Sequence, residues 1–415
     1  MSLDKIIKLA YLCFTVYAVS ITDITTLTMK DTVPAVIFMW AIFMFFSLGY
    51  QTNTQKNLYS EEIKNKKAWL LNRKTSTIIL LASLSVLSSV LSAKYYTGQS
   101  PITVLTGIFS DNRSLYAEYQ LHSKINNISS FSIIKIPYIL MMFYVKLSVF
   151  YFSITYLLIK VKISFLDKII LGMVIGSHIY FGLARGTNYE LFEIVMLIIF
   201  ITLTKKNRKK MSIKLVGIVG IVGTMVFLFY ERISSRGFEF NYMVNMDYNF
   251  NPNGIISTIS KDMVFMITLL YDYFGFGFYY ISKYIMEVWF VTPMNFAKNL
   301  IPYSYAANNT SIMEVVSNQI SMGSRWHPDL ILLINSLGVI ISLILVYFIG
   351  KFSSYIRREN EDTAIVKLTE FIVLLQMVSF PIGNFIFISS ASTLIVLILV
   401  VVWLWKILIN KKIII

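Results

Sequence analysis

The segment Gly323–Gly350, GSRWHPDLILLINSLGVIISLILVYFIG, sets Arg325, His327 and Asp329 directly before an almost unbroken apolar run. A run of about 20 apolar residues is long enough to cross the hydrocarbon core of a bilayer as an α-helix. Pro328 suits the first position of that helix because its missing N–H needs no partner there, and Asp329 suits the positive end of the helix dipole. The segment therefore predicts a transmembrane helix that is preceded by a polar segment, Gly323–Asp329.

The composition of the whole chain extends this prediction. The chain has 415 residues, of which 56% are hydrophobic and 14% charged, and its mean hydropathy is +0.66. These values lie outside the range of soluble globular proteins. The apolar residues fall in runs of about 17–24, each long enough to span a bilayer. We therefore predict an all-α polytopic integral membrane helical bundle that forms a single transmembrane domain over residues 1–415.

The apolar runs predict about ten transmembrane helices. They are expected at residues 6–22, 33–50, 77–93, 137–159, 166–184, 187–204, 213–230, 329–350, 367–386 and 388–408. One region allows an alternative, because Pro381 and Gly383 lie near the middle of 365–409 and both residue types interrupt helices. That region is either two spans or a single broken one.

The net charge of +15 could indicate a nucleic-acid-binding protein, so the placement of the basic residues has to be compared with the spans. Most of the Lys and Arg residues fall in short alternate loops, such as the run Lys205–Lys210, and are not collected on one folded surface. Loops rich in Lys and Arg stay on the cytoplasmic side of a membrane. The distribution predicts that both termini are cytoplasmic, and it argues against nucleic acid as a partner.

Two external loops are predicted to be long, residues 94–136 and 231–327. Long loops often carry function. Within the second loop, the stretch 263–301 is too apolar to be free in water. Asp272 and Lys283 interrupt it, so an interfacial or re-entrant pair of helices fits it better than two more spans. The positive and negative charges of the loop 231–327 nearly cancel, so an anion would bind at individual Lys or Arg side chains of the loop.

The first candidate site is the polar segment Gly323–Asp329. His327 is expected at the helix N-cap, where backbone N–H groups point outward and attract phosphate. The positive end of the helix favours a neutral imidazole that can accept a proton, although Asp329 acts in the opposite direction. Gly338 follows His327 by eleven residues, close to three turns of a continuous helix, so both are expected on one side. The alternative is an interfacial histidine flanked by Arg325 and Trp326 at the membrane boundary.

The second candidate site is the tight external turn at Arg185 and Gly186, between two predicted spans. Glu190 and Glu193 are three residues apart and would enter the outer part of the membrane on one helix face. A charged group at the centre of a transmembrane helix costs about 2.5–3.5 kcal/mol, so charges at this depth indicate function. The alternative is that Arg185 pairs with these carboxylates and fastens two helices together.

The third candidate site is the pair Arg232 and Arg236, just outside the predicted span 213–230. A planar guanidinium grips phosphate oxygens in pairs, so several arginines at the outer rim would neutralise a diphosphate without a metal. Contact with water or lipid headgroups is the alternative. The sequence has no HExxH motif, paired cysteines or His/carboxylate cluster with ligand spacing, so no metal site is predicted. A P-loop is also missing, so use of ATP is not expected.

Together these features resemble the bacterial O-antigen polymerase (Wzy) family, the oligosaccharide repeat unit polymerases of O-antigen and capsule assembly. The resemblance rests on ten or more spans, cytoplasmic termini, a large late outer loop with arginines, and the Arg185–Gly186 turn. The related O-antigen ligases carry a histidine, ten further residues and a glycine, and His327 and Gly338 match that spacing. The outer-loop arginines do not reproduce the polymerase pattern of Arg, ten residues, Gly. The ligase pattern of Arg, three residues, Leu is absent at Arg185.

The resemblance implies a GT-C-like fold in the bacterial inner membrane, with the two long loops and the active site on the periplasmic side. The implied substrate is an oligosaccharide repeat unit on undecaprenyl diphosphate, which serves as donor and as acceptor. A hydroxyl of the incoming unit would attack the anomeric carbon of the growing chain and release undecaprenyl diphosphate. No cofactor is implied. The implied partners are the lipid bilayer and a flippase and chain-length regulator of the same pathway.

Such a displacement needs cationic donors for the departing diphosphate and the removal of one proton. The diphosphate-binding residues would be four arginines, Arg185, Arg236, Arg325 and, as a weaker candidate, Arg232. The catalytic group would be His327, on the acceptor hydroxyl or a diphosphate oxygen, with Arg185 and Arg325. Glu190, Glu193 and Gly338 would be supporting residues.

Three other functions stay open. An O-antigen ligase passes the same donor to lipid A core, and the spacing of His327 and Gly338 favours it. A lipid-phosphate-sugar glycosyltransferase of the GT-C kind needs an acidic residue in the first outer loop, where Asp23 and Asp31 are expected. A polysaccharide flippase or transporter lines a path near the midplane with charges, whereas the charges of this chain are expected at the outer ends of its spans.

Overall fold

The computed structural model describes residues 1–51, 68–110, 112–126, 132–187, 189–205, 248–287, 329–357, 363–381 and 389–412, with the single positions 217, 220, 223, 227 and 383. Within these residues the chain is helical and has no β-strand. The pairing of extended backbone found there is one isolated bridge between Thr25 and Phe250. The predicted all-α class is confirmed for this part of the chain. Four predicted site residues lie outside it: Arg232, Arg236, Arg325 and His327.

Long helices form the body of the described structure. They are α1 (Leu3–Ile24), α2 (Val33–Gln51), α3 (Thr75–Thr97), α6 (Ile136–Ser153) with its π-helical continuation η5 (Ile154–Ile159), α7 (Phe165–Ala184), α8 (Tyr189–Thr204), α15 (Asp329–Ile356), α16 (Thr363–Ser379) and α17 (Ser390–Lys412). Shorter elements lie between them. These are η1 (Met29–Asp31), η3 (Trp69–Asn72), α4 (Pro101–Ser110), α5 (Asn112–Ile125), η4 (Ile133–Lys135), η6 (Ile256–Thr258), α10 (Lys261–Phe274) and α11 (Phe276–Glu287).

Among the described residues, 7 helices are long and apolar enough to cross a membrane. They are α1, α2 with η1, α3, α6 with η4 and η5, α7, the part of α15 that begins at Gly338, and most of α17. The helices α8 and α16 have 16 and 17 residues, somewhat short for a full crossing. The predicted span at 213–230 lies outside the described residues except for four single positions. The chain is a multi-pass helical membrane protein, and seven of the ten predicted spans are supported by length and composition.

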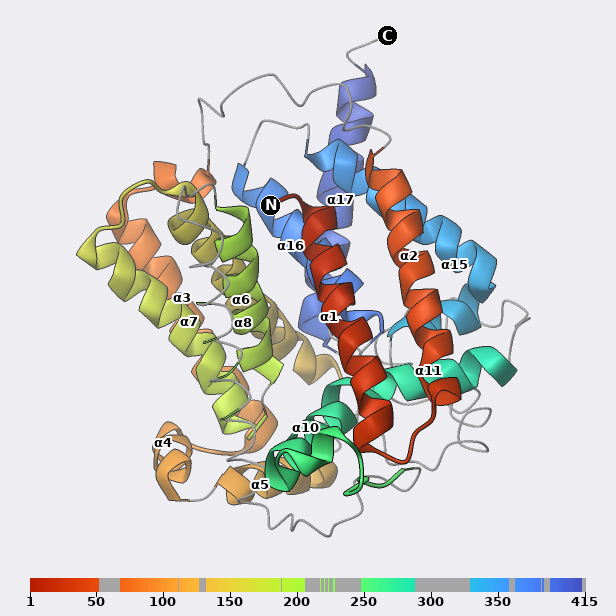
Figure 1. The fold of residues 1–415 in the computed structure, drawn as a ribbon. Coiled ribbons are helices and arrows are strands. Elements are labelled where there is room, and N and C mark those ends of the chain that lie inside the picture. The colour runs from red at the N-terminus through yellow and green to blue at the C-terminus, as the bar shows by residue number, and fades with distance from the viewer. Residues whose placement is uncertain are drawn as a thin grey trace.

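Figure 1 shows the long helices running side by side, with four shorter helices gathered at one end of them. α4 and α5 belong to the predicted loop 94–136, and α10 and α11 belong to the predicted loop 231–327. α11 lies across the end of the bundle, and the start of α1 and the end of α17 lie at the opposite end. Two helices, α10 and α11, cover most of the described part of the stretch 263–301, where a pair was predicted, and its interfacial or re-entrant placement stays a prediction. Both predicted loops therefore contribute helices to a common end of the bundle.

α2 and α15 form the most extensive helix pair of the described structure. Two glycines lie at their crossing. A Cβ on Gly49 of α2 would overlap the Tyr347 carbonyl oxygen, and a Cβ on Gly350 of α15 would overlap the Phe46 carbonyl oxygen. Small residues at a crossing allow two helix backbones to touch, which is how many transmembrane helices associate. The missing side chains of both glycines therefore set the distance between α2 and α15.

α15 is interrupted at Gly338, which has φ 74° and ψ 167°. Glycine adopts such a conformation readily, whereas a residue with a Cβ is strained there. The hydroxyl of Ser342 donates to the Gly338 carbonyl oxygen at 2.6 Å, next to the break. His327 lies outside the described residues, so the expectation that it shares a helix face with Gly338 stays a prediction, and the helical phase changes only beyond Gly338.

α16 and α17 are two separate antiparallel helices. The indole N–H of Trp403, late in α17, donates to the hydroxyl of Thr369, early in α16, at 3.0 Å. A single broken span would hold these two residues at opposite ends. The structure therefore supports two helices over the region 365–409. The first turn of α17 packs inside the bundle against α6.

Candidate functional site

The turn at Arg185 and Gly186 is built from local hydrogen bonds. The N–H of Gly186 donates to the carbonyl of Leu183 at 2.9 Å, and the N–H of Thr187 donates to the carbonyl of Gly182 at 3.0 Å. These two bonds form a Schellman motif, which ends α7 and requires a residue in the left-handed region. Gly186 has φ 62° and fills that requirement. The turn brings α8 back along α7 as its antiparallel neighbour.

Substitution of Gly186 by Ala is expected to destabilise the protein by about 1–2 kcal/mol, the cost of the left-handed conformation for a residue with a Cβ. The new Cβ would also lie 3.0 Å from the backbone nitrogen of Tyr116 in α5. The measurement is the apparent melting temperature in detergent. Gly176→Ala is the matched control, because no atom lies within 4 Å of its added Cβ on the same helix. Equal melting temperatures for the two variants would contradict the expectation.

Arg185 pairs with Glu190 across this turn. The guanidinium Nη2 contacts Oε1 of Glu190, and the hydroxyl of Thr187 donates to Oε2 at 3.1 Å. The guanidinium also lies over the ring of Phe181, 4.7 Å from its centroid. The side chain of Arg185 is 22% exposed and that of Glu190 only 3%. The structure therefore shows the predicted ion pair for Glu190, whereas Glu193 has other partners, and the guanidinium is the member of the Arg185–Glu190 pair that reaches the surface.

The charge of Arg185 is secure in this position. Burial acts to lower its pKa, but the Glu190 carboxylate and the phenols of Tyr119 and Tyr189 act more strongly in the other direction, so its pKa is raised. The guanidinium is therefore positively charged at any pH at which the protein is folded.

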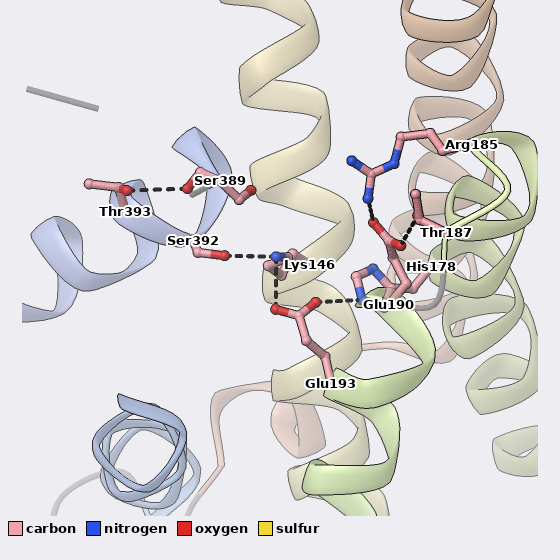
Figure 2. A network of polar contacts seen from close by, with 9 residues as sticks. All are labelled: Lys146, His178, Arg185, Thr187, Glu190, Glu193, Ser389, Ser392 and Thr393. Atoms are coloured by element: carbon pink, nitrogen blue, oxygen red, sulfur yellow. Dashed lines mark hydrogen bonds and ion pairs between the residues drawn. The ribbon is translucent and has the colours of Figure 1, made fainter. Parts of the chain in front are cut away.

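A second polar cluster centres on Glu193, one turn further along α8 (Figure 2). The ammonium of Lys146 in α6 donates to Oε1 of Glu193 at 2.8 Å and to the hydroxyl of Ser392 in α17 at 2.7 Å. Nε2 of His178 in α7 lies 3.0 Å from Oε2 of Glu193. The side chains of Lys146, His178 and Glu193 are 3%, 0% and 0% exposed. One buried carboxylate thus joins three helices and, through Lys146, a fourth.

The two clusters lie on one face of the α7–α8 interface. His178 and Gly182 are one turn apart on α7, and Glu190 and Glu193 are one turn apart on α8, so each pair shares a helix face. His178 faces Glu193, and Glu190 lies against Gly182, where a Cβ would meet Oε2 of Glu190 at 2.8 Å. Both carboxylates also lie near the start of α8, where the helix dipole favours negative charge. The ionisable groups therefore form a line that runs inward from Arg185.

The line balances in charge when His178 is neutral, because Arg185 offsets Glu190 and Lys146 offsets Glu193. Such balance is required, since an unpaired buried charge is strongly destabilising. An ionised carboxylate only accepts hydrogen bonds, so the hydrogen between Glu193 and His178 belongs to Nε2 of the imidazole. Nδ1 then carries a lone pair, and it has no hydrogen-bond partner among the described residues.

Lys146 and His178 lie deeper than the outer ends of their helices. His178 is six residues before the end of α7 at Ala184, which corresponds to roughly 9 Å along the helix. Lys146 lies near the middle of the helix formed by α6 and η5. Lys146 falls inside the predicted span 137–159, and the expectation that the charges gather at the ends of the spans does not hold for His178. Both were visible in the sequence as ionisable side chains within apolar runs, but the sequence does not show that they meet Glu193.

Of the other predicted site residues, the structure describes only Gly338, and it lies outside this site. Gly338 belongs to α15, which packs mainly on α2 and α16. The positions of Arg232, Arg236, Arg325 and His327 fall outside the described residues. Of the predicted set, the structure brings together Arg185, Glu190 and Glu193, and it adds Lys146 and His178.

Asp23 and Asp31 hold the connection between α1 and α2 to the segment 248–287. The Asp23 carboxylate accepts the backbone N–H groups of Ile255 at 3.0 Å and Ile256 at 2.8 Å. Asp31 pairs with Lys283 of α11 at 3.0 Å. Each aspartate therefore joins the connection between α1 and α2 to the segment 248–287.

In the described part of the chain, no group of three or more His, Cys, Asp or Glu side chains is placed to hold a metal ion. In comparisons with known proteins, no family model, no curated protein and no solved structure matches the chain. The chemistry of the side chains defines what the site can do. It can bind an anion at the partly exposed guanidinium of Arg185, and it can exchange a proton at the buried imidazole of His178.

Proposed function

We propose that this chain is an integral membrane glycosyltransferase that polymerises oligosaccharide repeat units carried on undecaprenyl diphosphate, in O-antigen or capsule assembly. The observation that carries the proposal is the line of ionisable side chains that starts at the partly exposed Arg185 and continues inward to His178, Glu193 and Lys146. A cation at the entrance and proton-exchanging groups behind it are what glycosyl transfer from a diphosphate requires. The resemblance to the Wzy family supplies the substrate class.

The end of the bundle that carries Arg185 is proposed to face the periplasm. At the opposite end, where α7 begins and α8 ends, lie Lys160, Lys162, Lys168 and Lys205. Basic residues in short connections mark the cytoplasmic side. The start of α1 and the end of α17 lie at that same end (Figure 1). On this proposal both termini are cytoplasmic, and the protein lies in the bacterial inner membrane.

In the proposed reaction, Arg185 exchanges Glu190 for an oxygen of the lipid diphosphate. A guanidinium has five N–H groups, so it can bind phosphate oxygens in pairs, and Nε of Arg185 has no partner among the described residues. The loop 231–327 is proposed to complete the site from its own cations. These are Arg232, Arg236 and Arg325 for the diphosphate, with His327 at the acceptor hydroxyl or a diphosphate oxygen. The bond to the leaving diphosphate supplies the driving force, so ATP is not needed.

Arg185→Ala is expected to lower the turnover of purified protein about 10²–10³-fold, as the loss of a preorganised donor to developing negative charge does. In a deletion strain of a smooth-type bacterium that expresses the variant, lipopolysaccharide with single repeat units should replace the long chains. Arg73→Ala is the matched control, because Arg73 is exposed at the other end of the bundle and lies 4.3 Å from the ring centroid of Trp69. Wild-type banding for Arg185→Ala would contradict the proposal, and complete loss of repeat units in the deletion strain would indicate a ligase.

A flippase or transporter for lipid-linked oligosaccharide is the second candidate function. The cluster of Lys146, Glu193 and His178 favours it, because ionisable groups inside a membrane bundle are typical of transport paths. Purified protein in detergent separates the two candidates. Elongation of repeat units without a membrane requires an enzyme. Movement of labelled lipid-linked oligosaccharide across vesicles, without elongation, would indicate transport.

A further inference from the structure

We propose that His178 is a buried proton-binding site, in which Nδ1 takes up the proton and the pair of Glu193 and Lys146 sets its occupancy. Only one of the two ring nitrogens of His178 has a hydrogen-bond partner among the described residues. Nε2 of His178 is held by Glu193 at 3.0 Å, whereas Nδ1 has no partner among the described residues although the ring is fully buried. A buried polar atom without a partner is costly to keep. Protonation gives this atom a function that accounts for its retention.

Helices α8, α6 and α3 contribute the groups around His178. α8 presents Glu193, with Glu190 one turn away, and α6 presents Lys146 (Figure 2). The edge of the ring meets Phe150 of α6 at a centroid distance of 6.4 Å. Ser177, the residue before His178 on α7, shares a hydrogen bond of 2.8 Å with Ser85 of α3, so α3 contributes hydroxyl groups on the adjoining side of α7. The charges nearest to the ring are therefore one carboxylate in contact and the ammonium that shares it.

The two oxygens of Glu193 serve two competing partners. When His178 is neutral, Lys146 neutralises the carboxylate through Oε1. When Nδ1 binds a proton, the imidazolium becomes a second cation on Oε2, and Lys146 can shift its charge toward Ser392, at 2.7 Å, and toward the ring of Tyr189, 4.8 Å from the ammonium. The carboxylate favours the protonated ring and the ammonium opposes it. Removal of each partner should therefore change the occupancy in opposite directions.

This site has a defined place in the transfer reaction, a role that rests on the proposed function. The acceptor oxygen forms a bond to the anomeric carbon, the bond from that carbon to the diphosphate oxygen breaks, and the diphosphate keeps the electron pair. On this assignment His327 stays with a diphosphate oxygen, and the hydroxyl proton passes to the carboxylate of Glu190. No described side chain bonds to Nδ1 of His178, so the proton reaches Nδ1 through an intervening water. His178 holds the proton until the diphosphate has left, and the proton then passes back through Glu190 to an oxygen of the released diphosphate.

Nuclear magnetic resonance of ¹⁵N-histidine tests the proton site without substrate. The chain has three histidines, so the substitutions His122→Gln and His327→Gln leave His178 as the single signal. At neutral pH we expect a neutral ring with hydrogen on Nε2 and none on Nδ1, and on acidification we expect a doubly protonated ring. A ring with hydrogen on Nδ1 at neutral pH would overturn the proposal. A ring that stays neutral at every pH at which the protein remains folded would also overturn it.

Two variants test the control by Glu193 and Lys146. At a fixed pH, the doubly protonated fraction should fall in Glu193→Gln and rise in Lys146→Met. If either single variant does not fold, the double variant Lys146→Met/Glu193→Gln removes both charges together and keeps an amide oxygen for Nε2. The two removals act in opposite directions, so the doubly protonated fraction of the double variant should exceed that of Glu193→Gln and lie below that of Lys146→Met. A double variant with the same fraction as the single variant that folds would contradict the assigned control.

A transfer assay on the purified protein tests the role separately. His178→Gln should lower kcat about 10²–10⁴-fold, the usual contribution of general acid–base groups, and leave KM for the lipid diphosphate unchanged. It should also flatten the acid limb of the pH–rate profile. A wild-type rate and profile in His178→Gln would remove the catalytic role while the spectroscopic proton site stands. No transfer by the wild-type protein would remove the proposed function, and the spectroscopic result would still decide the site.

Discussion

Lys146→Met is expected to lower the free energy of unfolding by about 3–5 kcal/mol, because removal of one partner of a buried ion pair leaves the other charge without compensation. In this protein the remaining charge would be the fully buried carboxylate of Glu193, which would keep only His178 as its partner. Ser392 would lose its contact with the ammonium as well. The measurement is the apparent melting temperature in detergent, together with the fraction of protein that elutes as a single species.

The double variant Lys146→Met/Glu193→Gln should recover most of this loss. Replacement of both members of a buried pair by uncharged residues of similar volume is often neutral or stabilising. Lys168→Met is the matched control, since Lys168 is exposed at the other end of α7 and has a side chain of the same length. A single variant as stable as the wild type would show that the pair is not essential to the bundle. A double variant as unstable as the single one would show that packing, and not charge, is the cause.

Gly350→Val should separate α2 from α15 and destabilise the protein by about 3 kcal/mol or more, at or above the usual range for overpacking. The reason is that the first added carbon would meet the Phe46 backbone, which cannot turn away as a side chain can. Gly49→Val should act similarly from the other helix, through the backbone of Tyr347. The melting temperature in detergent reports both effects.

Gly176→Val is the control for this pair of variants. It places the same branched side chain in a helix at a position with nothing within 4 Å of the new Cβ. Its effect should be limited to the small helix-propensity difference between the two residue types. If Gly350→Val and Gly176→Val have the same melting temperature, the close approach of α2 and α15 does not contribute to stability.

The sequence predicts this fold well where a single segment decides the outcome. The thickness of the bilayer requires long apolar runs, and these runs mark the helices directly. The apolar stretch within 231–327 likewise predicted α10 and α11. The break at Gly338 was missed because the conformation of a glycine depends on what the flanking helix segments pack against, and periodicity does not show that.

The candidate site also contains contacts that one segment decides and contacts that helix packing decides. Glu190 and Glu193 share a helix face and Arg185 lies in the adjoining turn, so helix geometry alone placed these three together. Lys146 and Glu193 are far apart in the sequence, and their contact depends on how α6 and α8 pack. His178 faces Glu193 only because the turn at Gly186 sets the register of α7 against α8. Contacts that depend on the packing of separate helices could not be read from one sequence.

The crossing of α2 with α15 also bears on how the protein is made. Gly49 and Gly350 are about 300 residues apart in the chain, so at about 5–20 residues per second α2 would leave the ribosome roughly 15–60 s before its partner. During that interval the face of α2 that carries Gly49 lacks its partner α15, and lipid or a membrane insertion factor covers it. Assembly of the native bundle therefore includes a late step in which α15 displaces that lipid or insertion factor from α2. Slow synthesis of the middle of the chain should lengthen the time for which membrane proteases can cleave the incomplete protein.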